Sequence, residues 1–197
     1  MRAALLLAAT ATLLAGCNPE VTQSNRQKEA ERVEAVKDVK GWDRAFGAVP
    51  ESIAAANQFG FRVGDYAATG GGTPGYRAAG HPVTLSNSAA KAPNRASFIA
   101  SGAAPERFDS IVFRLSLTDP AGAELARDRL GKLVRDYLFQ FGIKADPLMA
   151  KIAKGEAGES ELDGVPVKIE TGTEEGANRL TVTFTRPATI AAGNSKA

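Results

Sequence analysis

Cysteine and histidine are almost absent from this chain of 197 residues, which contains one of each. A disulfide within one chain needs two cysteines, so the domain has to be stabilised by its own hydrophobic core. The same scarcity excludes a zinc site built from several Cys and His ligands of one chain.

An excess of charge of either sign is also lacking, because 22 Asp and Glu residues offset 24 Lys and Arg residues. A nucleic-acid-binding protein normally carries a basic surplus or stripe, so no nucleic-acid partner is expected. Hydrophobic residues make up 44% and charged residues 23% of the chain, as in soluble globular domains. The length suits one domain and is too short for two of ordinary size.

The longest hydrophobic run stands near the N-terminus, where residues 3–14 carry no charge. A membrane-spanning helix needs about 20 apolar residues, so this run has the length of a signal peptide instead. It ends in Leu14-Ala15-Gly16-Cys17. The small residues Ala15 and Gly16 let the backbone enter a narrow peptidase site, and Cys17 supplies a thiol.

This motif resembles the lipobox of bacterial lipoproteins, which has a large apolar residue, two small residues and an acceptor cysteine. The resemblance implies that residues 1–16 are removed and that Cys17 carries a diacylglycerol and an N-acyl chain. Two or more acyl chains hold a protein stably on a membrane. Asn18 stands where an aspartate favours the inner membrane, so it favours the outer membrane, facing the periplasm. The alternative is an ordinary cleavable leader in which Cys17 is incidental.

Residues 17–41 are predicted to comprise the lipidated cysteine, a polar spacer and a charged helix over Lys28–Lys40. That helix has only a narrow apolar stripe, whose members are Ala30, Val33, Val36 and Val39. It is either a solvated helix leading into the domain, which we favour, or a helix that pairs with a partner.

Residues 42–187 are predicted to form one α+β domain, followed by a flexible tail over residues 188–197. Alternating hydrophobic residues predict strands over residues 96–101 and 109–118 and around Val167 and Val182. Asp119-Pro120 and Asp146-Pro147 each place a capping aspartate before a helix-starting proline.

The resulting order is β-β-α-α-β-β after a less regular N-terminal part. It predicts an antiparallel sheet of about four or five strands with a long amphipathic helix and a shorter helix packed on one face. The long helix should end near Phe141 and the shorter one at Gly155. Pro166 predicts an edge strand, because proline cannot donate to a ladder, and residues 172–178 are expected to form a polar loop.

Candidate catalytic groups are few. His81 lies between Gly80 and Pro82, and no Gly-x-Ser-x-Gly sequence accompanies it, so a surface histidine is favoured. An acidic group near the C-terminal hairpin offers oxygen ligands for a cation, although a solvated loop is favoured. Its members are Glu156, Glu159, Glu161 and Asp163. No metal site, cofactor or catalytic residue is assigned.

Three functions remain open. The first is a non-catalytic envelope lipoprotein acting in structure, assembly or interaction with another envelope protein. The second is a lipoprotein that binds a lipid or metabolite in a pocket around Trp42, Phe59, Phe61 and Tyr66. The third, ranked last, is a hydrolase of cell-wall or ester substrates that uses His81. The outward threonines of the last strand form either a polar binding face or a plain exposed face.

Replacing the acceptor thiol tests the lipid anchor. We expect the Cys17→Ser protein to appear in the soluble fractions of a bacterial host, because serine cannot form the thioether that holds the acyl chains. Intact mass of the wild-type protein extracted from membranes should show a chain that starts at Cys17 with added acyl mass. A Cys17→Ser protein that stays membrane-bound would contradict the anchor.

Overall fold

The computed structural model describes residues 39–70, 74–87, 89–174 and 176–188. The lipobox with Cys17, the polar spacer and the tail from residue 189 therefore lie outside the described residues, as does the expected helix up to residue 38. Val39 and Lys40, the two described residues of that expected helix, are not helical.

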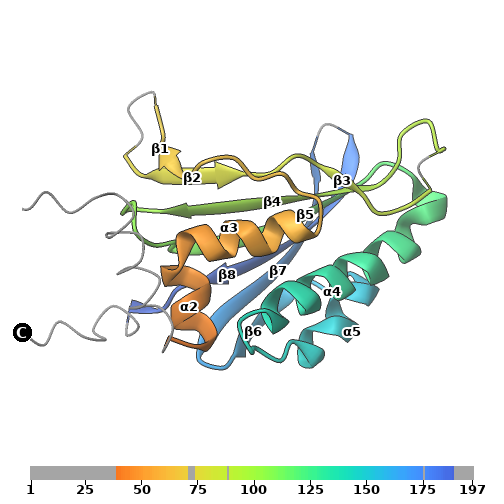
Figure 1. Cartoon of the computed structure of the whole chain (residues 1–197). Helices are drawn as coiled ribbons and strands as arrows, with labels where there is room; N and C mark the ends of the chain where they lie inside the picture. Colours follow the sequence, from red (N-terminus) through yellow and green to blue (C-terminus); the bar gives the residue numbers. More distant parts are fainter. Residues whose placement is uncertain (1–38, 71–73, 88, 175, 189–197) are drawn as a thin grey trace, which may run out of the picture. The chain divides into compact units, whose positions relative to one another are not determined.

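One antiparallel sheet of eight strands forms the centre of the described part of the chain (Figure 1). The order is β1-β2-β4-β5-β8-β7-β6, and β3 pairs with β4 off this path. The strands are β1 (Ala67–Ala68), β2 (Tyr76–Ala79), β3 (Val83–Thr84), β4 (Arg95–Gly102), β5 (Ser110–Leu117), β6 (Gly158–Leu162), β7 (Val165–Glu174) and β8 (Ala177–Thr185).

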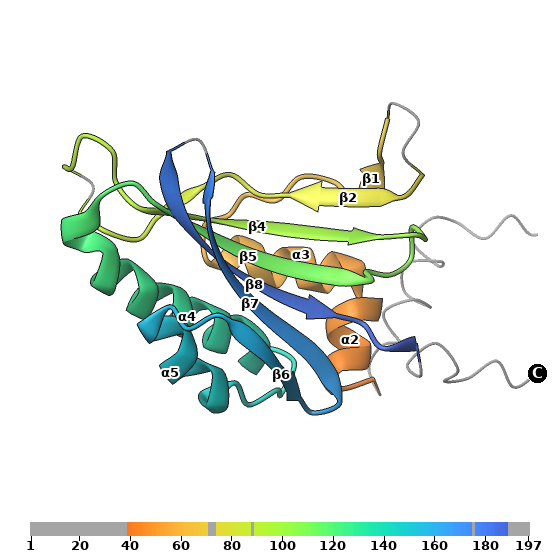
Figure 2. The same ribbon diagram turned by 180° about the vertical axis from the view of Figure 1, so that it is seen from behind.

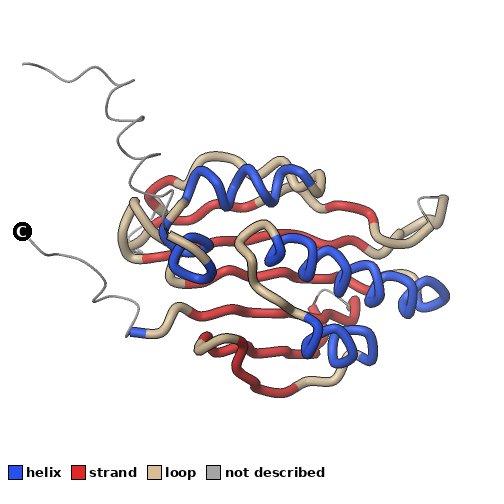
Figure 3. The backbone as a smooth tube through the Cα atoms, turned by 60° about the horizontal axis from the view of Figure 1, so that its bottom comes forward, coloured by secondary structure: helices blue, strands red, loops and turns tan. Residues whose placement is uncertain are grey.

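Four α-helices pack on one face of this sheet, as Figure 3 shows. They are α2 (Gly41–Gly47), α3 (Val49–Gln58), α4 (Ala123–Phe139) and α5 (Asp146–Lys154). The predicted α+β architecture with an antiparallel sheet is confirmed. The predicted four or five strands and two helices are too few, because β1, β2, β3 and β6 also join the sheet and the helices α2 and α3 precede it in the chain.

The long helix begins as its sequence predicts. The side chain of Asp119 accepts a hydrogen bond from the Ala121 N–H, and Pro120 opens a 3-10 turn that continues into α4. Leu130, Val134 and Tyr137 are fully buried, as expected from their spacing. The helix ends at Phe139, two residues earlier than predicted, because the chain turns before Gly142, where φ is +77°.

Aromatic rings join the sheet to the helices. The ring centroid of Phe113 in β5 lies 5.4 Å from that of Phe98 in β4, 5.2 Å from that of Tyr137 in α4 and 6.4 Å from that of Phe184 in β8. Trp42 of α2 lies 5.3 Å from Phe184 on the same side. These contacts are made by side chains that alternate along the strands, so one face of the sheet forms the core.

Two predictions about the C-terminal strands are wrong. β7 pairs with both β6 and β8, so Pro166 does not mark an edge strand. The register with β8 begins only at Val167, one residue after the proline, and the ladder therefore tolerates it. Residues 172–174 and 177–178 form strands rather than a loop, since the β7–β8 ladder extends through the pair Glu174–Ala177.

Residues 61–66 have no regular secondary structure. The strands of this region come later, at β1, β2 and β3, which contain two to four residues each. Strands this short show no measurable alternation, so their formation depends on pairing with β4 and β2.

Truncation at the centre of the aromatic cluster tests this core. We expect Phe113→Ala to lower the free energy of unfolding by about 3–5 kcal/mol, because the ring is fully buried and leaves a cavity. Phe139→Ala is the matched control, with a ring 73% exposed, and should cost less than about 0.5 kcal/mol. Urea denaturation measures both, and equal losses would contradict the described packing.

Candidate functional site

The four aromatic residues predicted to form a ligand pocket lie in different surroundings. Trp42 and Phe61 belong to the buried core, where Nε1 of Trp42 donates a hydrogen bond to the Leu162 carbonyl at 2.8 Å. Phe59 is partly buried against the same core. Tyr66 instead lines a surface cavity, so the structure does not bring the four side chains together around one ligand.

The cavity beside Tyr66 has a volume of about 520 Å³ and is open to solvent. Its lining combines apolar side chains of α3 with polar groups of the segment that follows. The residues are Val49, Pro50, Ile53, Asn57, Val63, Gly64, Asp65, Tyr66 and Pro105. An open depression of this kind can bind the apolar edge of a small ligand.

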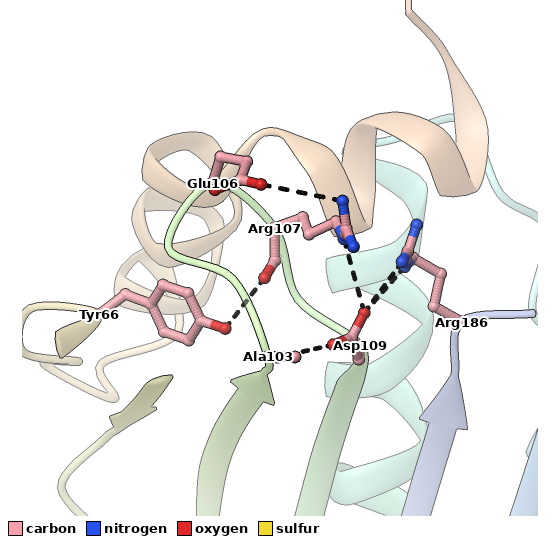
Figure 4. A network of polar contacts seen from close by, with 6 residues as sticks. All are labelled: Tyr66, Ala103, Glu106, Arg107, Asp109 and Arg186. Carbon is pink, nitrogen blue, oxygen red and sulfur yellow. Dashed lines mark hydrogen bonds and ion pairs between the residues drawn. The ribbon is translucent and has the colours of Figure 1, made fainter. Parts of the chain in front are cut away.

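A network of polar contacts lies beside this cavity, with Asp109 at its centre (Figure 4). Asp109 Oδ2 accepts a hydrogen bond from the Ala103 N–H at 2.7 Å, and Oδ1 accepts one from Arg186 Nε at 3.1 Å. Arg107 Nε lies 3.8 Å from the same Oδ1, within ion-pair distance. The carboxylate therefore ties the β4–β5 loop to the end of β8.

The hydroxyl of Tyr66 completes this network by donating a hydrogen bond to the Arg107 carbonyl at 2.9 Å. Gly102 makes room for it, because a Cβ there would lie 2.6 Å from the hydroxyl oxygen. Burial, followed by the negative charges of Asp109 and Glu106, raises the pKa of Tyr66 to about 12. The phenol is therefore a neutral donor at physiological pH, which suits a structural contact.

A larger candidate surface is the sheet face opposite the helices, which no other described element covers (Figure 2). Because side chains alternate along strands, the neighbours of the buried residues point to this face. Adjacent strands align its polar groups in rows, such as Ser97, Arg114, Thr181 and Glu170. The outward threonines of β8 expected from the sequence lie here.

Charge is separated across this face. On β2, β4, β5 and β8 its charged residues are all arginines, namely Arg77, Arg95, Arg114 and Arg179. On β6 and β7 acidic residues dominate, namely Glu159, Glu161, Glu170 and Glu174, with Lys168 among them. We call the first group the basic half of the sheet face and the second its acidic half.

The boundary between the halves is bridged by ion pairs. Glu174 contacts Arg179 Nη1 and lies 3.7 Å from Arg114 Nη1. The hydrogen bond and charge of Arg179, together with the charge of Arg114, hold the pKa of Glu174 below its usual range. Lys168 Nζ lies 2.8 Å from Glu170 Oε1, and this bond raises the pKa of Lys168.

A second cavity, of about 360 Å³, opens at the end of the basic half. Its lining residues are Pro82, Lys91, Ala92, Pro93, Arg95, Ser97, Ser116 and Thr118. The sequence pattern placed Ser116 and Thr118 on the outer side of a strand. It did not identify Lys91 or Arg95 as neighbours of these hydroxyls, because both lie far from β5 in the sequence.

The other chemical candidates of the sequence are separate from both cavities. His81 is exposed, and its backbone N–H donates to the Phe61 carbonyl at 2.5 Å. Glu159 and Glu161 lie on strand β6, so the solvated-loop interpretation is wrong for these two residues. The sequence signal for this hairpin was Asp163-Gly164, whose φ values of +49° and +82° are those of a two-residue turn.

Within the described ranges, no group of three His, Cys, Asp or Glu side chains is placed to hold a metal ion.

In comparisons with known proteins, no family model, no curated protein and no solved structure matches this chain. None of the described helices combines the length and apolar character needed to cross a bilayer.

The raised pKa of Tyr66 makes its contribution to stability depend on pH. At pH 7 we expect Tyr66→Phe to lower the free energy of unfolding by about 1 kcal/mol, the net contribution of one hydrogen bond. This difference from wild type should persist below pH 10, the tyrosine value of the unfolded chain, and vanish as pH rises through about 12. Thermal unfolding of both proteins across that range measures it, and a difference that is constant with pH would contradict the assignment.

Proposed function

We propose that this protein is a lipoprotein of the bacterial cell envelope whose domain is an interaction module. The anchor is supported by Leu14-Ala15-Gly16-Cys17, with the membrane reached through the acyl chains on Cys17. Asn18 supports a place on the outer membrane, facing the periplasm. The domain binds an anionic partner through the uncovered face of its sheet.

One observation carries the second part of this proposal, namely the separation of charge on the sheet face. Four arginines on the strands β2, β4, β5 and β8 have no acidic residue among them on those strands' outer side. A surface patch of one sign attracts partners of the opposite sign and excludes those of the same sign. Serine and threonine hydroxyls between the arginines add hydrogen-bond donors and acceptors.

A photo-reactive residue placed on this face tests the interaction in living cells. We expect the residue at Thr183, near the C-terminal end of β8, to form conjugates that a Lys132 variant on the outer side of α4 does not form. Conjugation should fall when Arg95 and Arg179 are both changed to glutamine, because the partner is anionic. Mass spectrometry identifies the attached material.

Two results would contradict the proposal. Absence of conjugates at Thr183 would show that the sheet face has no partner in the cell. Conjugates whose yield is unchanged in the double glutamine variant would show a partner that is not recognised by charge.

A lipid or metabolite bound beside Tyr66 is the second candidate function. The observation that favours it is the open cavity of about 520 Å³, lined by Val49, Ile53 and Pro105 among others. A compound that raises the melting temperature of wild type but not of Ile53→Glu would support this function.

A further inference from the structure

At one end of the basic half of the sheet face, three arginines lie on adjacent strands. Arg95 of β4 stands opposite Ser116 of β5, and Ser116 stands opposite Arg179 of β8. Arg114 is two residues from Ser116 on the same side of β5. Adjacent strands are about 4.8 Å apart, so the backbones of Arg95 and Arg179 are separated by about 10 Å and their long side chains can reach a common ligand.

Positive charge exceeds negative charge at this end. Arg114 and Arg179 share one carboxylate, that of Glu174. Among the described residues, Arg95 and Lys91 take part in no ion pair, and both side chains are exposed. Two of these four cations thus share one acidic group, and the other two, Arg95 and Lys91, are available to a ligand.

The second cavity places hydroxyl groups beside these two cations. Ser97, Ser116 and Thr118 line it together with Lys91 and Arg95, and its volume of about 360 Å³ is within the range of small-molecule sites. Thr118 Oγ1 donates hydrogen bonds to the carbonyls of Ala92 and Pro93 at 2.9 and 3.0 Å. These bonds hold the segment that carries Lys91 against the end of β5.

We propose that this end of the basic half is a phosphate-binding site, formed by Lys91, Arg95, Ser97 and Ser116. A phosphate group offers several oxygen acceptors and as many as two negative charges, so it can use donors that come from different strands. A carboxylate carries a single negative charge and only two acceptor oxygens, so it can use fewer of these donors. The inference rests on the proposed role of the sheet face and names the chemistry of its ligand.

Two kinds of molecule can present such a phosphate, a lipid head group and a soluble phosphate. Isothermal titration calorimetry on the full lipidated chain in non-ionic detergent separates them. Glycerophosphoglycerol, the deacylated head group of phosphatidylglycerol, serves as the diester probe, and inorganic phosphate serves as the soluble probe. Stronger binding of the diester indicates a lipid head group, and stronger binding of inorganic phosphate indicates a soluble ligand.

Arg95→Gln should weaken binding of the preferred probe by about tenfold or more, since a charge-assisted hydrogen bond is lost. Arg135→Gln is the matched control. It removes the same charge from an exposed arginine of α4, which packs on the opposite face of the sheet. Its affinity should stay within about twofold of wild type, and thermal unfolding should show equal stability for both variants.

Three outcomes would overturn the proposal. The first is no measurable binding of either probe at low salt, and the second is equal weakening by Arg95→Gln and Arg135→Gln. The third is binding of acetate as tight as that of phosphate at equal ionic strength. If conjugates form at Thr183 but both phosphate probes fail, the sheet face remains a binding surface and only the phosphate chemistry is refuted.

Discussion

Phe113 packs against Phe98, Tyr137, Phe184 and Phe61, and this cluster of rings is the contact on which the rest of the domain depends. The five residues come from three strands, one helix and the irregular segment after α3. No two neighbouring elements could form the cluster alone, so sheet and helices have to assemble together. The burial of these large aromatic side chains stabilises a chain that cannot form an internal disulfide.

The orientation of that core decides where the sheet face lies. Because the side-chain period of a strand is two, turning Phe113 inward turns Arg114 and Val112 outward. The same holds for β4 and β8, which pair with β5 in register. The basic half of the sheet face is therefore the reverse side of the hydrophobic core. A slip of one residue in any of these strands would bury an arginine, which the core strongly disfavours.

Parts of this fold were predictable because their signals lie within a few residues. Alternation of Leu180, Val182 and Phe184 with threonines predicted β8, and Asp119 with Pro120 predicted the start of the α4 helix. The short strands β1 and β3 were not predictable, because two residues carry no period. The prediction of an edge strand from Pro166 was wrong, because the effect of a proline on a ladder depends on where pairing with the next strand begins.

The motif that resembles a lipobox, the Asp119 cap and the strands with clear alternation follow from the order of residues alone, since each depends on covalent neighbours or on a local period. The candidate site does not. Arg95 and Arg179 are 84 positions apart in the sequence and meet Ser116 only because β4, β5 and β8 pair in one particular register. That register is selected by packing against the helices, which is a property of the folded domain and of no single segment.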